Sequence, residues 1–247
     1  MGNRWAILSD IHANLEAFKG VLDHIAALSV DKIICLGDIV GYNTDPSACI
    51  ALCREWEIFC LMGNHDAAVC GRIPLENFNA NAALAIKWTR NQLTKEDFLF
   101  LNRLPRSHQE DKKFLCFHGS LLDPDRYLFF QQDAEKDFSE MRKTYPEIPL
   151  GFFGHTHQRR VFSHYLGLVT SGTPGDFFLD PGRLYLVNPG SVGQPRDNNP
   201  MASYLIYHED DRHISFHHVL YDVRKTAEKI LKAGLPKKLA ERLFEGW

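Results

Sequence analysis

The sequence predicts an α/β fold in which two β-sheets are flanked by helices. Between residues 5 and 62, short apolar runs alternate with amphipathic segments, which indicates strand–helix–strand units with parallel strands and right-handed crossovers. After residue 160, short β runs are separated by turn sequences, which favours antiparallel pairing. Polar motifs extend from position 10 to position 197. We therefore expect residues 1–247 to form one domain with two sheets.

The first 103 residues are predicted to contain strands at residues 5–9, 32–36 and 58–62, and helices at about 15–25, 46–55 and 79–103. In the first helix, Leu15, Phe18, Leu22 and Ile25 recur at spacings of three and four, which forms one apolar stripe. Asp45 is predicted to cap the second helix, with Pro46 at its first position. The third helix is expected to break near Thr94, whose hydroxyl can cap the segment that follows.

The rest of the chain is predicted to be richer in strands. Strands are expected at residues 114–117, 150–153, 160–162, 168–171, 183–187, 203–207 and 214–220, and helices at 133–145, 223–233 and 237–244. Pro146 ends the first of these helices, and Pro236 begins the last.

Composition narrows the class of function. The net charge of −3 shows no excess of basic residues, so we expect no extended nucleic-acid surface. We expect no membrane segment, because no run approaches the roughly 18 apolar residues that one needs. The six cysteines form no C-x-x-C pair, which favours reduced thiols and a cytoplasmic protein. The sequence does not indicate the oligomeric state.

Five of the twelve histidines and two aspartates fall at the ends of predicted strands. With one asparagine, they are Asp10 and His12, Asp38, Asn64 and His65, His118, and His155 and His157. A lone histidine there is usually an ordinary surface or hydrogen-bonded residue, and an aspartate before a helix is usually a cap. Together they favour a site, since strand ends of an open α/β sheet converge on one crevice. In extended backbone, residues two apart project to the same side, so both i, i+2 pairs could point inward.

Imidazole, carboxylate and amide groups without a thiolate suit Mn, Fe or Zn, and not Ca or a copper–thiolate centre. A metal site would also allow an acidic protein to bind an anionic substrate.

At these residues the chain resembles the calcineurin-like metallophosphoesterases. The blocks that carry the resemblance, in the expected order, are Asp10-x-His12, Gly37-Asp38, Gly63-Asn64-His65-Asp66, His118-Gly119 and Gly154-His155-x-His157. Residues 188–197, NPGSVGQPRD, resemble the bacterial branch of small phosphodiesterases and diadenosine-tetraphosphatase-like proteins. The resemblance covers nearly the whole chain and implies a four-layer αββα sandwich.

The resemblance also implies a dinuclear centre with two divalent transition-metal ions (Mn, Fe or Zn). One metal would take Asp10, His12, Asp38 and His157, and the other would take Asp38, Asn64, His118 and His155. Asp38 would then bridge the two metals. By the same resemblance, a hydroxide between the metals attacks phosphorus in line, and His65 protonates the leaving oxygen as general acid. The implied activity is hydrolysis of nucleotide-type or other small phosphodiesters.

Alternative functions are a phosphomonoesterase, a Ser/Thr-type protein phosphatase, and a non-catalytic metal-binding scaffold. Protein phosphatases read G-D-x-x-D-R-G in the second block, whereas Gly41 and Tyr42 stand here where Asp and Arg are expected. The scaffold is disfavoured because His65 and all seven implied ligands are present.

Candidate substrate-binding residues are Arg196, Arg126 and Asn14. Arg196 could contact phosphate or form a structural salt bridge. Arg126, with its neighbour Tyr127, lies just past the fourth block, and Asn14 could instead cap the first helix.

Two further features stay open in the sequence. Asp66 could orient His65 or tie down its turn. Phe78, Asn79 and Asn81 could line the substrate entrance, or their segment could be a simple covering loop.

Overall fold

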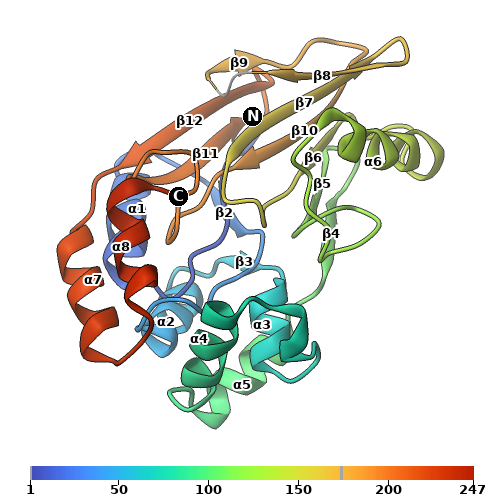
Figure 1. Ribbon diagram of the computed structural model, residues 1–247. Coiled ribbons are helices and arrows are strands. Elements are labelled where there is room, and N and C mark those ends of the chain that lie inside the picture. The colour runs from blue at the N-terminus through green and yellow to red at the C-terminus, as the bar shows by residue number, and fades with distance from the viewer. Residues whose placement is uncertain (1, 173–174) are drawn as a thin grey trace.

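Two six-stranded β-sheets lie face to face at the centre of the molecule, as the computed structural model shows (Figure 1). The structure describes residues 2–172 and 175–247. The first sheet has the order β3 (Phe59–Cys60), β2 (Lys32–Cys35), β1 (Arg4–Leu8), β11 (Ala202–His208), β12 (His213–Val219), β9 (Phe177–Phe178). The second has the order β4 (Ser107–Glu110), β5 (Phe114–Phe117), β6 (Leu150–Phe152), β10 (Leu184–Pro189), β7 (Arg159–Tyr165), β8 (Leu168–Gly172).

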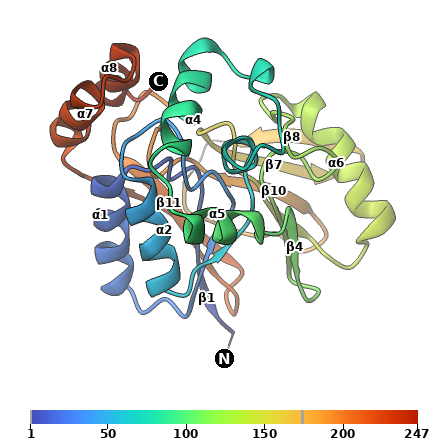
Figure 2. The same ribbon diagram turned by 90° about the horizontal axis from the view of Figure 1, so that it is seen from below.

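Helices cover the outer faces of both sheets (Figure 2). They are α1 (Leu15–Ala26), α2 (Pro46–Glu55), α3 (Asn64–Val69), α4 (Ala80–Arg90), α5 (Lys95–Asn102), α6 (Gln131–Thr144), α7 (Val223–Lys232) and α8 (Lys237–Glu245), with a short 3₁₀ turn at Leu75–Asn77. The arrangement confirms the predicted two-sheet sandwich flanked by helices.

Period-two alternation along β1 shows how one strand serves two cores. Trp5 and Ile7 point into the space between the sheets, where they pack with residues such as Phe114. Ala6 and Leu8 point to the opposite face, toward α1 and α2. On the far side, α6 packs Phe138 and its neighbours against the outer face of the second sheet. Four layers result.

Parallel pairing in both sheets positions the strand ends. β1 pairs parallel with β2, and β2 with β3. In the other sheet, β5 pairs parallel with β6. The chain therefore leaves these five strands at matching ends, as the strand–helix alternation predicts.

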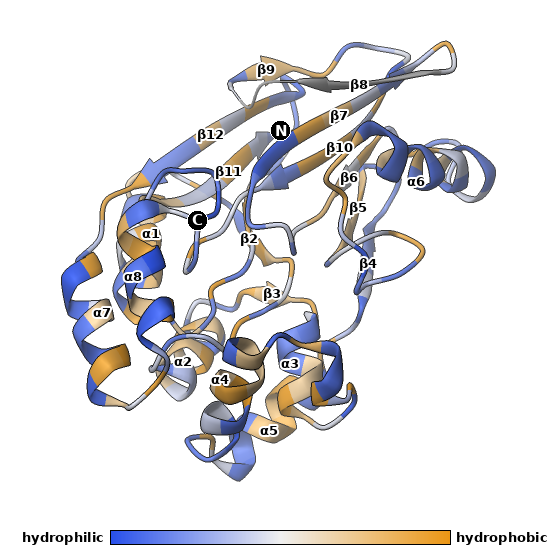
Figure 3. Cartoon of the chain, viewed as in Figure 1, coloured by the Kyte–Doolittle hydropathy of each residue, from blue (hydrophilic) through white to orange (hydrophobic). Residues whose placement is uncertain are grey.

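The C-terminal helices are fixed by their own apolar cluster. Leu239, Ala240 and Leu243 of α8 pack with residues of α7, with Ala82 and Ala85 of α4, and with the loop residue Tyr42. The ribbons of α7 and α8 alternate between hydrophobic and hydrophilic residues, as expected for helices that bury one face (Figure 3).

Several local predictions were wrong. The strand predicted at 58–62 is shorter in the structure and covers only β3, although the Leu61 amide still donates to the Cys35 carbonyl of β2 at 2.8 Å. β4 was missed because its residues are polar and it lies at a sheet edge. Asp45 makes no side-chain capping bond and instead binds Lys229 at 2.9 Å.

Candidate metal centre and active site

The predicted site residues converge from both sheets. Asp10 and His12 follow β1, Asp38 follows β2, Asn64 and His65 open α3 after β3, His118 follows β5, and His155 and His157 follow β6. All are buried except Asn64, which is half-buried. The convergence expected from the strand ends is therefore present.

One group of possible ligands consists of Asp10, His12, Asp38 and His157. Nε2 of His157 lies 3.3 Å from Oδ1 of Asp10. Nε2 of His12 lies 3.5 Å from Oδ2 of Asp38 and 3.1 Å from Nε2 of His157. These four side chains surround a space of ionic size.

A second group consists of Asp38, His118 and His155, with Asn64 beside it. Nε2 of His118 lies 3.4 Å from Oδ2 of Asp38 and 3.1 Å from Oδ1 of Asn64. Oδ2 of Asp38 therefore stands between both groups, as a bridging carboxylate must.

Backbone carbonyls orient the imidazoles. Nδ1 of His12 lies 3.1 Å from the Val40 carbonyl, and Nδ1 of His157 lies 2.7 Å from that of Gln194. A carbonyl only accepts, so each Nδ1 carries the proton and each Nε2 presents a lone pair to the cluster.

The protonation of this cluster suits a cation. Burial lowers the pKa of His12 and of His157 well below 6.5, so both rings are neutral and their lone pairs face each other. That arrangement is repulsive unless a cation lies between them.

Backbone carbonyls also orient the imidazoles of His118 and His155. Nδ1 of His118 lies 3.1 Å from the Leu36 carbonyl, which again leaves Nε2 for the cluster. His155 is reversed: its Nε2 lies 3.1 Å from the Asp125 carbonyl, so Nδ1 faces inward.

The buried carboxylates also favour positive charge. Oδ1 of Asp10 and Oδ2 of Asp38 are buried, and neither has a hydrogen-bond partner among the described residues. Burial raises the pKa of Asp10 to about 7. Burial alone would lower the pKa of His118, but the Asp38 carboxylate outweighs burial and the pKa is raised to about 9. These orphaned oxygens and inward lone pairs fit divalent cations with nitrogen and oxygen ligands.

The backbone reaches this geometry by a route that the sequence did not predict. Asp10, His12, His155 and His157 all have positive φ, between 47° and 64°, so neither i, i+2 pair is extended. The inward direction was right, but its expected cause was wrong. Left-handed conformations of non-glycine residues are costly and cluster at functional sites.

Two glycines allow the loops to approach one another. A Cβ on Gly63 would lie 2.1 Å from Oδ1 of Asp38, and one on Gly154 would lie 1.9 Å from Oγ of Ser9. Any side chain at these positions would displace the Asp38 carboxylate or the β1 strand end.

His65 lies beside the cluster without belonging to either ligand group. Its ring centroid is 4.7 Å from that of His12 and 4.4 Å from that of Tyr42, and its Nδ1 is buried without a partner. Burial lowers its pKa to about 4, and an anionic substrate nearby would raise it.

Asp66 ties down the turn and does not orient His65. Its carboxylate accepts the amide protons of Gly63 at 3.0 Å, Val40 at 3.1 Å and Ile39 at 3.3 Å. Burial raises its pKa to about 7, against the lowering effect of those hydrogen bonds. Asp66 therefore joins the Asp38 loop to the start of α3.

The three candidate substrate-binding residues have different surroundings in the structure. Arg196 lies at the cluster, where it binds Oε1 of Gln194 at 3.0 Å, and its Nε is buried without a partner. The alternative, a structural salt bridge of Arg196, has no ion pair among the described residues to support it; its neighbour Asp197 pairs with Arg159 at 2.8 Å instead.

Asn14 and Arg126 serve structural contacts. Asn14 is fully buried; its Oδ1 accepts the Ala17 amide at 3.2 Å, and its Nδ2 donates to the Gly193 carbonyl at 2.9 Å. The helix cap is therefore the correct alternative for Asn14. Arg126 donates to the Asp133 carbonyl at 2.6 Å, and its phosphate contact stays a prediction.

A pocket of about 120 Å³ opens at His65 and His155. Phe78 and Asn79 line it, as one reading of the sequence suggested, together with Tyr42, Tyr127 and Asp125. Tyr127 stacks on His155 with ring centroids 3.9 Å apart. The roles of Tyr42 and Asp125 could not be predicted from the sequence. Asp125 contacts His155 through its backbone carbonyl, and Tyr42 is positioned by packing against α4 and α8.

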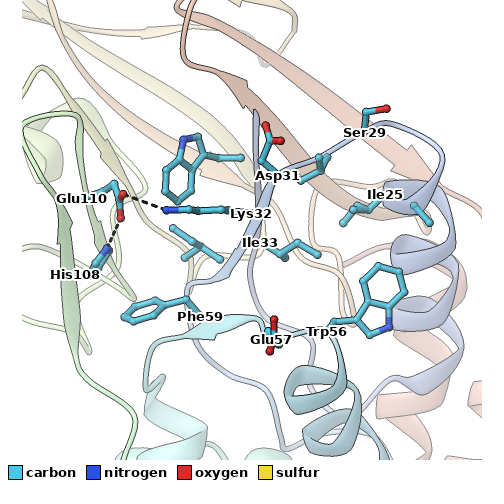
Figure 4. Close-up of a pocket in the computed structure, with 14 residues that line it drawn as sticks. Ile25, Ser29, Asp31, Lys32, Ile33, Trp56, Glu57, Phe59, His108 and Glu110 are labelled. Atoms are coloured by element: carbon cyan, nitrogen blue, oxygen red, sulfur yellow. Dashed lines mark hydrogen bonds and ion pairs between the residues drawn. The ribbon is translucent and has the colours of Figure 1, made fainter. Parts of the chain in front are cut away.

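A larger cavity of about 530 Å³ lies at the opposite ends of β1 and β2 (Figure 4). Three of its polar side chains pair with one another: Glu110 binds His108 at 3.0 Å and Lys32 at 3.7 Å. Neither possible ligand group contributes a residue to this cavity, whereas His65 and His155 line the smaller pocket.

Comparisons with known proteins agree with this geometry. Residues 4–212 match the model of the calcineurin-like phosphoesterase superfamily domain. An uncharacterized protein of Methanocaldococcus jannaschii is 41% identical over 244 residues, covering 98% of this chain and 97% of its own length. Among the described residues, none of the helices combines the length and apolarity that crossing a bilayer requires.

Solved structures extend the likeness. A metallophosphoesterase from Sphaerobacter thermophilus superposes with a TM-score of 0.83 at 36% identity, covering 99% of both chains. A hypothetical protein from Pyrococcus horikoshii shares the fold, with a TM-score of 0.80 at 19% identity over 99% of this chain and 98% of its own. The chain therefore belongs to the calcineurin-like phosphoesterase superfamily, and it is a phosphoesterase enzyme with an Asp/His cluster that could hold metal.

Proposed function

We propose that this protein hydrolyses phosphodiesters, of a nucleotide type or other small ones, with two divalent metal ions. One observation carries the proposal: Oδ2 of Asp38 stands 3.5 Å from His12 and 3.4 Å from His118, between two ligand groups. The similarity of residues 188–197 to the small phosphodiesterase branch supports the diester. A cytoplasmic location remains a prediction from the cysteines.

The ligand sets follow from the inward atoms. Asp10, His12, Asp38 and His157 would hold one ion, and Asp38, Asn64, His118 and His155 would hold the other. When bound, two such ions would neutralise phosphate charge and activate water as the nucleophile.

His65 is the proposed general acid. It lines the pocket beside the cluster and is not needed as a ligand, so it can deliver a proton to the leaving oxygen. Arg196 would contact a phosphate oxygen, because its guanidinium lies near Asp10 and His157 without a carboxylate partner among the described residues.

The first test combines metal analysis with a substrate panel. Purified protein should contain nearly two transition-metal equivalents. With Mn²⁺ it should hydrolyse bis(p-nitrophenyl) phosphate faster than p-nitrophenyl phosphate, cyclic nucleotides or a phosphopeptide, with diadenosine polyphosphates as further candidates. A faster monoester would indicate a phosphomonoesterase, and a faster phosphopeptide a protein phosphatase. Metal-loaded protein that turns over none of them would indicate a scaffold.

Variants test the individual roles. His65→Ala should retain both metals and lose turnover most on esters with high-pKa leaving groups, whereas His108→Ala, at the distant cavity, serves as the control. Equal loss on all esters together with lost metal would make His65 a ligand. Asp38→Ala should remove both metals, and retention of one intact site would contradict bridging.

A further inference from the structure

Two tyrosines, one from the loops of each sheet, stand beside the candidate metal ligands. Tyr42 follows β2, and its ring centroid is 4.6 Å from that of His12 in the first possible ligand group. Tyr127 follows β5, and its ring stacks on His155 of the second group at 3.9 Å. Both tyrosines line the pocket that opens at His65. Each ligand group therefore has one phenol beside it.

Tyr42 is held there in an unfavourable backbone conformation. Its φ is 59°, a left-handed value that bulky residues rarely adopt. The apolar cluster of α4, α7 and α8 packs against its ring and keeps the residue in place. Non-glycine residues in such conformations cluster at functional sites, which points to a role for Tyr42 beyond packing.

Tyr127 is held by stacking. Its ring is nearly parallel to that of His155, at 19°, and to that of Phe129, at 10° with centroids 5.1 Å apart. The residue is nevertheless 43% exposed and lines the pocket, so a ligand there can reach it.

Both phenols have the Arg196 guanidinium as a neighbour. Nη2 of Arg196 donates to the Tyr42 hydroxyl at 3.4 Å. Burial raises the pKa of Tyr127, and the charge of Arg196 lowers it, which places the guanidinium near that hydroxyl too. A guanidinium has no lone pair and takes no proton from a phenol. Among the described residues, neither phenol donates its own proton to an acceptor, so both protons can go to a ligand.

The pocket itself is lined by neutral donors. Among the described residues, its lining includes neither Arg196 nor any other arginine or lysine, and its one carboxylate belongs to Asp125. A phosphodiester carries a single negative charge on two non-bridging oxygens. Two neutral phenols next to one guanidinium match that acceptor, because hydrogen bonds to an ionised oxygen are stronger than those between neutral groups.

We propose that the hydroxyls of Tyr42 and Tyr127 donate hydrogen bonds to the non-bridging oxygens of the phosphodiester that lies at the Asp/His cluster. The assignment rests on the proposed function, because the phosphate concerned is the scissile one. The two tyrosines would then bind the substrate together with Arg196, one beside each ligand group, without taking part in a covalent step.

Phenylalanine variants isolate the hydroxyls, because they keep the rings and their packing. Tyr42→Phe and Tyr127→Phe should each weaken the binding of inorganic phosphate to Mn²⁺-loaded protein about tenfold in calorimetry, as the loss of one hydrogen bond to a charged group would. With bis(p-nitrophenyl) phosphate, kcat/KM should fall by about the same factor. The affinity for Mn²⁺ should not change, because neither hydroxyl belongs to a ligand group.

Tyr165→Phe is the matched control. Its ring also lies beside an arginine, since the Arg183 guanidinium is 4.9 Å from the ring centroid, but Tyr165 ends β7 and does not line the pocket. This variant should change neither phosphate binding nor turnover. Urea unfolding shows which variants keep the fold. Should Tyr42→Phe unfold, Tyr127→Phe still tests the phenol donors, because Tyr127 is exposed.

The outcomes distinguish the role of the phenols from the proposed function. Wild-type phosphate affinity in both phenylalanine variants would overturn that role, while hydrolysis of bis(p-nitrophenyl) phosphate by the wild type would still uphold the phosphodiesterase. A change in one variant alone would overturn the role of the other tyrosine. Loss of Mn²⁺ together with phosphate would also overturn it, because the tyrosines would then act on the metal ligands. If the wild type hydrolysed no diester, the proposed function would fail, and phosphate binding would still decide the role of the hydroxyls. A wild type that binds no phosphate with Mn²⁺ present would reject it.

Discussion

Asp66→Ala should destabilise the protein severely, although Asp66 touches no candidate ligand side chain. The carboxylate is fully buried and accepts three backbone amides, from Gly63, Ile39 and Val40. These amides belong to the two loops that carry Asp38 and Asn64. Removing the acceptor leaves buried donors unsatisfied and separates the loops.

The magnitude follows from those contacts. Each buried donor that loses its partner costs about 1–3 kcal/mol. The 3.3 Å contact from Ile39 shares Oδ2 with Gly63 and counts for little. Two full contacts and one weak one give about 3–5 kcal/mol, a large fraction of the roughly 5–15 kcal/mol that stabilises a typical domain.

Urea unfolding of metal-free protein measures this cost, and metal titration measures its effect on the site. Asp133→Ala is the matched control, because Asp133 accepts the amides of Phe129 and Phe130 at a half-buried helix start away from the cluster. It should cost about 1 kcal/mol. If the two alanine variants unfold within about 1 kcal/mol of each other, the role given to Asp66 is wrong. If Asp66→Ala does not fold, Asp66→Asn takes its place. This variant keeps one acceptor oxygen, so its loss of stability should lie between those expected for Asp66→Ala and Asp133→Ala.

Four further outcomes are expected. Burial raises the pKa of Glu16, but hydrogen bonds from Lys229 and Lys225 outweigh this effect and lower the pKa below its ordinary value of 4.5. The ionised Glu16 therefore stabilises the fold above pH 4.5, and this stabilisation is lost as the pH falls. Lys229→Gln should reduce the loss of stability at acid pH, which circular dichroism would follow. Gly154→Ala, whose methyl would lie 1.9 Å from Oγ of Ser9, should cost about 1–3 kcal/mol and weaken metal binding in a titration. Leu239→Ala should lower the free energy of unfolding by about 2–5 kcal/mol. We propose that residues 1–247 fold as one domain, so the variant should unfold in urea in a single transition. A separate early transition would contradict the single domain. Removing the metal with a chelator should lower the Tm in scanning calorimetry. The loss of stability should be about 2.7 kcal/mol if the free metal concentration was a hundredfold above its Kd.

Most of the candidate site could be predicted because its signals are local. An apolar run followed by Asp38, or by His118, identifies a strand end without knowledge of distant residues. Parallel pairing then brings these ends together. The helix break at Thr94 was equally local, since its hydroxyl caps the Asp97 amide at 3.2 Å.

What could not be predicted depends on long-range contacts. From the sequence, Asn14 could have bound phosphate; in the structure its side chain is hydrogen-bonded to Thr226 of α7 and to the Gly193 carbonyl. The His155 ring is reversed by a carbonyl thirty residues away. The placement of α8 against Tyr42 depends on the apolar cluster that joins α4 to the C-terminal helices, and the intervening chain gives no sign of it.

The division of the cluster between the two sheets has a physical consequence. His12, Asp38 and Asn64 come from loops of the first sheet, whereas His118, His155 and His157 come from loops of the second. Each possible ligand group contains residues from both. The mixed inter-sheet core around Trp5 and Phe114 therefore sets the distance between the ligands, because a shift of one sheet against the other would move Asp38 relative to His118. The packing between the sheets thus controls the geometry of the candidate ligands, and a bound cation would in turn hold the sheets together.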